Sequence, residues 1–104
     1  MSSFNKDNNY KTDEDMIFYM VQDARLDLIG ELEAIIQYDN HIHEATNESL
    51  KETWKYIRDG ELMHVGELLA ALFYLAPYQK KLVELGFNRF IKRISEKKTD
   101  IKIF

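Results

Sequence analysis

Apolar side chains recur every three or four residues along the first half of the chain, the spacing of a helix that packs on another helix. Between residues 12 and 43 these positions are Ile17, Val21, Ala24, Leu28, Ile35, Tyr38 and Ile42. Thr12 precedes three acidic residues, which is typical of a helix N-terminus. The pattern therefore predicts a helix over 12–43. One position of the series is not apolar, because residue 31 is a glutamate.

The same spacing returns after a short connection around residues 43–47, whose sequence HEATN contains helix-capping residues. The apolar members of this second series are Leu50, Trp54, Ile57, Leu68, Ala71 and Leu75. They predict a helix over 47–75, which ends where the single proline of the chain prevents its continuation. The two remaining positions of the series are occupied by Glu61 and His64. We call each of the two series the seam of its helix.

A third, shorter helix is predicted over 78–97, with Lys and Arg around an apolar face formed by Val83, Phe87, Phe90 and Ile94. Residues 1–11 are polar and are expected to form a flexible arm, and residues 98–104 are expected to form a tail. One proline and four glycines leave few places for turns. We therefore expect a single all-α domain over 1–104, built from an antiparallel helical hairpin and a C-terminal helix.

The chain carries a net charge of −4 that is divided unevenly. Residues 78–104 contain eight Lys and Arg against three Asp and Glu, whereas residues 1–77 contain six against fifteen. The acidic part favours cations over nucleic acid as ligands. The absence of cysteine excludes disulfides, thiolate metal sites and a cysteine nucleophile. No apolar stretch approaches the roughly 20 residues of a membrane span, so we expect a cytoplasmic protein without a membrane partner.

Three ionisable side chains, Glu31, Glu61 and His64, take apolar positions on the two seams, and an antiparallel hairpin brings them to similar heights. No Lys or Arg shares either seam, and buried carboxylates without a compensating charge cost several kcal/mol. A divalent metal would supply that charge, and carboxylates with a neutral imidazole suit iron, manganese or zinc. The alternative is structural. Polar seam residues also fix the register of paired helices, and a single histidine on an apolar face is usually a core residue.

Three neighbouring side chains are further candidates. Tyr38 lies two turns after Glu31, and it is interpreted as a core residue or as a hydrogen-bond partner of a metal ligand. His41 and His43 lie at the end of the first helix, where we expect them to be solvated rather than to bind metal.

The number of ligands predicts a dimer. Ferritin-like di-iron bundles use a Glu from each of two helices and a Glu-x-x-His from each of the other two. This chain has one helix of each kind, so it holds half of such a site. Two chains would complete the site by pairing their hairpins into a four-helix bundle, with the metals at the dimer interface.

The stretches GELEAIIQYDNHI and RDGELMHVGELL, within residues 30–72, resemble the encapsulated ferritins, short ferritin-like proteins housed in encapsulin nanocompartments. The resemblance implies a ferroxidase centre that holds two irons per subunit pair, with Glu31, Glu61 and His64 as the ligands from each subunit. It places Tyr38 at the nearby tyrosine of the family. It also implies a ring of dimers, in which the third helix joins neighbouring dimers, and it makes an encapsulin shell a candidate partner.

Two features differ from the family pattern. The family has a glutamate just before the first ligand and another two positions after it, which form outer metal-uptake sites. The corresponding residues here are Gly30 and Glu33, so Glu33 is the remaining candidate for such a site. The chain ends in KKTDIKIF, which has an apolar tip but lacks the Leu/Ile-Gly-x-Leu core of the family's cargo peptide.

We thus expect a ferroxidase that oxidises Fe(II) to Fe(III) for iron storage or detoxification, with other divalent metals as candidate substitutes for iron. Its expected location is the cytoplasm, inside an encapsulin nanocompartment if the resemblance extends that far. The alternative is a non-catalytic helical interaction module that binds an acidic partner through the basic helix 78–97. The basic face of that helix has no aromatic platform for reading bases, so we expect no nucleic-acid partner.

Overall fold

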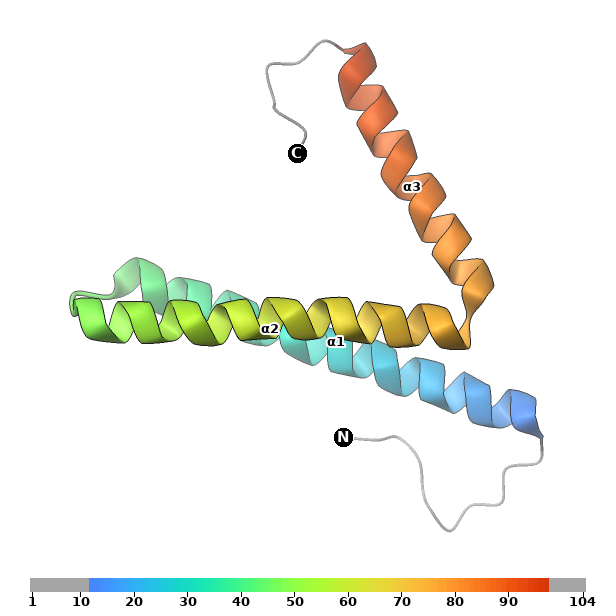
Figure 1. The fold of residues 1–104 in the computed structure, drawn as a ribbon, viewed down its shortest axis with the longest axis horizontal. Coiled ribbons are helices and arrows are strands. Elements are labelled where there is room, and N and C mark those ends of the chain that lie inside the picture. The colour runs from blue at the N-terminus through green and yellow to red at the C-terminus, as the bar shows by residue number, and fades with distance from the viewer. Residues whose placement is uncertain (1–11, 98–104) are drawn as a thin grey trace.

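A computed structural model describes residues 12–97 as three helices: α1 Asp13–Glu44, α2 Glu48–Leu75 and α3 Pro77–Glu96 (Figure 1). Within that range no residue is in a strand, so the all-α fold class predicted from the sequence is confirmed. Each helix begins and ends within one residue of its predicted bounds. The flexible arm predicted for 1–11 and the tail predicted for 98–104 lie outside the described residues.

Side-chain caps start the two long helices. Thr12 Oγ1 accepts a hydrogen bond from the amide of Asp15 at 3.1 Å, and Asn47 Oδ1 accepts one from the amide of Leu50 at 3.0 Å. Each bond satisfies one of the amides that a helix N-terminus leaves without a partner. α3 begins at Pro77, whose fixed φ and missing N–H suit the first position of a helix.

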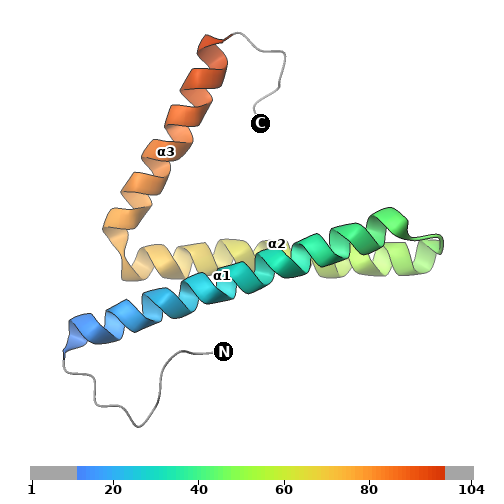
Figure 2. The ribbon, with the colours of Figure 1, turned by 180° about the vertical axis from the view of Figure 1, so that it is seen from behind.

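α1 and α2 are joined by residues 45–47 and fold back on each other as an antiparallel hairpin (Figures 1 and 2). On the α1 seam Val21 and Ala24 are buried as predicted, whereas Ile17, near the start of the helix, is 41% exposed. The α2 seam departs from the prediction at its start, where Leu50 is 50% exposed, and near its end, where Ala71 is exposed and Leu72 is buried. A straight α-helix drifts by roughly 20° per heptad relative to a strict seven-residue repeat. Ala71 lies three heptads after Leu50, and the accumulated drift turns it away from α1. The next residue, Leu72, therefore faces α1 in its place.

The buried core is small and lies at the end of the hairpin that adjoins α3. Among the described residues its members are Val21, Ala24, Leu72 and Ala76, with Leu28, Phe73 and Leu75 packed against them. The molecule extends over 14 Å along its shortest axis, against 52 and 42 Å along the other two. A layer this thin cannot enclose its apolar side chains, so many of them remain at the surface.

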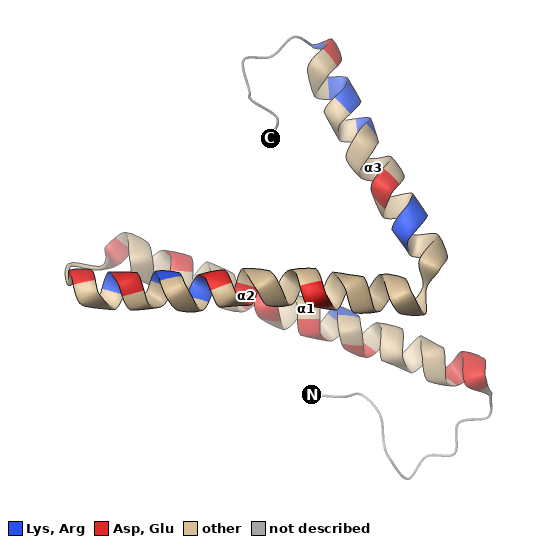
Figure 3. Cartoon of the chain, viewed as in Figure 1, with Lys and Arg blue, Asp and Glu red and all other residues tan. Residues whose placement is uncertain are grey.

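α3 leaves the end of α2 at a steep angle and lies apart from the rest of the hairpin in both views (Figures 1 and 2). All residues from 81 to 90 are exposed, and the Phe87 and Phe90 side chains are more than half exposed. Lys and Arg are frequent along α3, whereas Asp and Glu predominate on the hairpin (Figure 3). None of the helices within 12–97 combines the length and apolarity needed to cross a membrane.

Candidate metal centre

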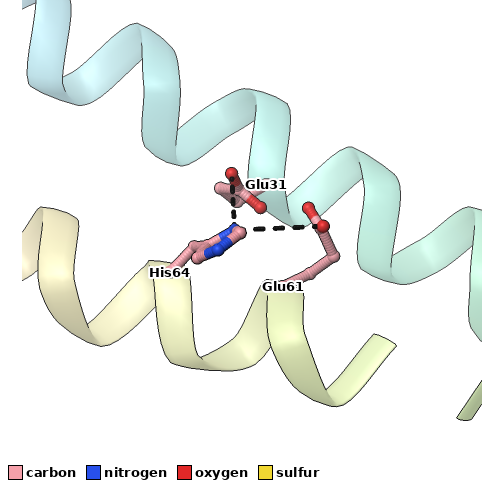
Figure 4. Close-up of side chains that lie close together, drawn as sticks. All are labelled: Glu31, Glu61 and His64. Carbon is pink, nitrogen blue, oxygen red and sulfur yellow. Dashed lines mark ion pairs between the residues drawn. The ribbon is translucent and has the colours of Figure 1, made fainter. Parts of the chain in front are cut away.

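The hairpin brings Glu31, Glu61 and His64 together near its middle (Figure 4). Glu31 projects from α1, and Glu61 and His64 project from successive turns of α2, because residues three apart share one face of a helix. One potential ligand atom from each residue lies within 4.8 Å of the other two. His64 Nδ1 is 3.4 Å from Glu31 Oε1 and 3.9 Å from Glu61 Oε1.

The two carboxylates are largely shielded from solvent, whereas the imidazole is not. The Glu31 and Glu61 side chains are 21% and 22% exposed, and that of His64 is 52% exposed. Glu31 Oε2 is buried and has no hydrogen-bond partner among the described residues. A buried oxygen of this kind is costly unless a further group satisfies it.

The closeness of the two carboxyl groups raises the pKa of Glu61 above the ordinary glutamate value of 4.5. The largest cause is a hydrogen bond with Glu31, followed by partial burial and by the negative charge of Glu31, while His64 acts in the opposite direction. Two carboxylates this close resist being charged together, which makes Glu61 harder to ionise than an isolated glutamate. A bound cation would relieve the same repulsion.

No basic side chain compensates these carboxylates in the part of the chain that the structure describes. The ion pairs of Glu31 and Glu61 there are with His64. Arg58, elsewhere on α2, is engaged by Asp39 at 2.7 Å and by Asp59 at 3.1 Å. Two carboxylates, one imidazole and a buried oxygen without a partner form a donor set that fits a divalent metal such as iron, manganese or zinc.

An open groove of about 560 Å³ borders the centre. Its lining includes Glu31 and His64 together with two more carboxylates, Asp27 and Glu67, that the sequence analysis missed. Asp27 precedes Glu31 by four residues and Glu67 follows His64 by three, so helical spacing alone could have identified both. Gly30 also lines the groove, and a Cβ atom added there would meet no atom within 4 Å.

The other candidate residues have mixed outcomes. Tyr38 is half-buried, with its ring 6.0 Å from that of His41. The expectation that His41 is solvated is wrong, because its ring packs 5.0 Å from that of Trp54 and its Nδ1 atom is buried. His43 is exposed, as expected. Glu33 is exposed and lies outside the three-residue cluster, so its part in metal uptake stays a prediction.

Neither a protein-family model nor a curated protein matches the chain. Among solved structures, the crystal structure of an encapsulated ferritin domain from Pyrococcus furiosus is similar to it, with a TM-score of 0.71 and 28% sequence identity. The match covers 97% of this chain and 93% of that one, so it includes α3 as well as the hairpin. The chain therefore shares the fold of an encapsulated ferritin domain over nearly its whole length, in agreement with the resemblance noted in its sequence.

Proposed function

We propose that two copies of this chain form a di-iron centre that oxidises Fe(II) to Fe(III), with dioxygen as the oxidant, for iron storage or detoxification. The observation that carries the proposal is the convergence of Glu31, Glu61 and His64 within 4.8 Å at the edge of an open groove. The structural likeness to an encapsulated ferritin domain supports a ferritin-like iron function.

The composition of the site explains why two copies are needed. Each chain offers two carboxylates and one imidazole, and two chains together offer the four carboxylates and two imidazoles of a ferritin-like di-iron site. The hairpin also exposes large apolar side chains near the centre, including Leu26 at 51% and Met63 at 67%. Exposed apolar surface of this kind is typical of a protein–protein interface.

Each residue of the centre has a proposed role. Glu61 would bind iron through its carboxylate, Glu31 would do so through the oxygen that is buried without a hydrogen-bond partner among the described residues, and His64 would donate a ring lone pair. Two Fe(II) would each give one electron to the same dioxygen, which with two protons from water would be released as hydrogen peroxide. The hairpin, residues 13–75, contains fourteen Asp and Glu against four Lys and Arg, and its negative field attracts Fe(II) to the groove. Tyr38 is proposed as a hydrogen-bond partner of a ligand.

The proposed assembly extends beyond the dimer. α3 exposes apolar side chains that would be covered in a ring of dimers, and an encapsulin shell is the proposed housing, because the similar structure is that of an encapsulated ferritin. The proposed location is accordingly the cytoplasm, inside such a shell. Zn(II) and Mn(II) are expected to bind the same residues without being oxidised by dioxygen as Fe(II) is.

The test combines iron binding with iron oxidation. The purified protein should bind two irons per subunit pair by native mass spectrometry, and its Fe(III) absorbance should rise on addition of Fe(II) in air. Glu61→Ala should lower the oxidation rate by at least about 100-fold, because the centre loses two of its carboxylates. Glu52→Ala, an exposed glutamate of the same helix, should oxidise iron at the wild-type rate. Equal rates for Glu61→Ala and wild type would end the di-iron proposal.

One observation favours a second candidate function. Residues 81–90 are exposed throughout, and α3 carries five Lys and Arg against two Glu, which suits a helical module that binds an acidic partner. Iron content separates the two candidates. An interaction module without a metal centre should contain no iron after purification from an iron-supplemented culture.

A further inference from the structure

The junction between α2 and α3 is short and well packed. α2 ends at Leu75 and α3 begins at Pro77, so Ala76 alone links them. Ala76 is only 5% exposed and belongs to the buried core at this end of the hairpin. Pro77 has a fixed φ, and a proline also narrows the conformations open to the residue before it. The backbone thus has little freedom at the point where the chain changes direction.

A side chain of α1 reaches across to the first turn of α3. Arg25 donates from Nη2 to Gln79 Oε1 at 3.0 Å and from Nη1 to Gln22 Oε1 at 3.4 Å. Gln79 in turn donates from Nε2 to the hydroxyl oxygen of Tyr78 at 3.1 Å. We call the hydrogen bonds from Gln22 through Arg25 to Gln79 the Arg25 bridge. The guanidinium suits this position because its planar fork can serve two acceptors at once.

The Arg25 bridge reaches α3 at its first turn. Every residue from 81 to 90 is exposed, and the helix lies away from the hairpin in both views (Figures 1 and 2). The junction and the Arg25 bridge therefore both act on one end of a 20-residue helix. A small rotation at the junction would move the far end of the helix by many ångströms, since the helix is about 30 Å long.

We propose that Arg25 is a positioning residue, which fixes the direction of α3 in each chain before any second copy binds. Its consequence for assembly rests on the proposed function. In a closed ring the angle between neighbouring contacts determines how many copies fit, so a fixed α3 selects one ring size. A helix that is already oriented also loses less conformational freedom when it binds.

Distances between two spin labels test the direction of α3 without any metal. The chain has no cysteine, so Glu52→Cys on α2 and Lys92→Cys on α3 give a labelled pair at two exposed positions. A second pair, Gln37→Cys with Glu52→Cys, reports on the hairpin alone. Labelled chains are mixed with an excess of unlabelled chains in chelator, so that distances within one chain dominate.

The expected result is a narrow distance distribution for both pairs in the otherwise wild-type chain. Arg25→Ala should broaden the α2–α3 distribution by roughly twofold or more and leave the hairpin pair unchanged. Arg89→Ala, which removes an exposed arginine beyond the junction, should leave both pairs unchanged. A broad α2–α3 distribution in the wild-type background, or one that Arg25→Ala leaves narrow, would overturn the proposal.

Native mass spectrometry tests the consequence for assembly. The wild-type chain should form rings of one mass, and Arg25→Ala should form several masses. An unchanged single mass beside a broadened α3 would refute the selection of ring size by Arg25. The spin-label distances are recorded in chelator and the ring masses with redox-inert Zn(II), so neither outcome depends on the oxidation of iron.

Discussion

The hairpin and α3 differ in packing, charge and exposure. The hairpin packs one seam of each helix against the other, places three ionisable side chains in the middle, and is acidic. α3 contacts the hairpin at its first turn, is basic, and exposes every residue from 81 to 90. The difference suggests a division of labour in which the hairpin holds the chemistry and α3 makes contacts with other copies. Substitutions, metal and pH each test that division, and the largest effect is expected from substitutions in α3.

Removing the apolar face of α3 should abolish higher assembly without affecting the chemistry. Phe87→Ser with Phe90→Ser replaces two side chains that are more than half exposed in the single chain. We expect rings to fall to dimers, a several-fold loss of mass in light scattering, while two irons per dimer are retained. Asn88→Ser, an exposed polar residue between them, should leave the rings intact. Loss of iron from a folded Phe87/Phe90 dimer would show that the two regions are not independent.

Metal should control the pairing of hairpins. Without metal, two copies would bring four carboxylates of Glu31 and Glu61 to one interface, where their charges repel. Addition of Fe(II), or of Zn(II) as a redox-inert substitute, should shift monomers toward dimers and larger species by about tenfold or more in association constant. Size-exclusion chromatography with light scattering measures this shift. Identical elution in chelator and in metal would argue against a metal-stabilised interface.

An apolar replacement at the centre should stabilise the metal-free chain. Glu61→Leu removes one of two close carboxylates and restores the apolar series of α2, so the melting temperature should rise by roughly 5 °C. The matched variant Glu52→Leu changes an exposed glutamate and should shift the melting temperature by less than about 2 °C. Thermal unfolding in chelator measures both. A lower melting temperature for Glu61→Leu would mean that Glu61 supports the fold rather than a metal.

The smallest expected effect is a dependence of stability on pH. Because the pKa of Glu61 is raised in the folded chain, the folded state holds this proton more tightly than the unfolded state does. The stabilisation is complete below the unfolded value of 4.5 and is lost as the pH rises through the folded pKa. The free energy of unfolding of the metal-free wild type, measured with denaturant, should therefore decrease over that pH interval. Glu61→Gln should reduce the slope of the free energy of unfolding against pH in this interval. An unchanged slope would mean that other ionisable groups cause the pH dependence.

Much of the fold could be predicted because its determinants are local. Thr12 and Asn47 cap their own helices, Pro77 begins the next one, and the α1 seam follows from the spacing of its apolar residues. The exchange of Ala71 for Leu72 on the α2 seam could not be predicted from spacing, because it depends on where a drifting series meets the partner helix. The direction of α3 was likewise inaccessible, since the Arg25–Gln79 contact joins residues 54 positions apart.

The candidate centre was found for a different reason, namely that Glu31, Glu61 and His64 interrupt an otherwise regular pattern. Asp27 and Glu67 were missed because they lie beside the seams, where acidic residues are common in any sequence. His41 was misjudged because its partner, Trp54, is on the other helix, and the position of the histidine near a helix end suggested solvent. The sequence pattern of one helix identifies residues that interrupt the pattern. Contacts between residues of α1 and α2 can be identified only from the three-dimensional structure.

The three-residue connection between α1 and α2 also determines the order of events after synthesis. Closing such a short loop costs little conformational entropy, and next to the loop the residues of α1 and α2 that pack on each other are close in sequence. Both features favour folding within microseconds to milliseconds. Association of chains is bimolecular, so its rate falls with dilution whereas the rate of hairpin formation does not. At low expression levels, folded monomers would thus persist for longer before they associate, with their apolar faces exposed to solvent. The yield of the assembled protein is expected to depend on the rate of synthesis more than on the stability of the single chain.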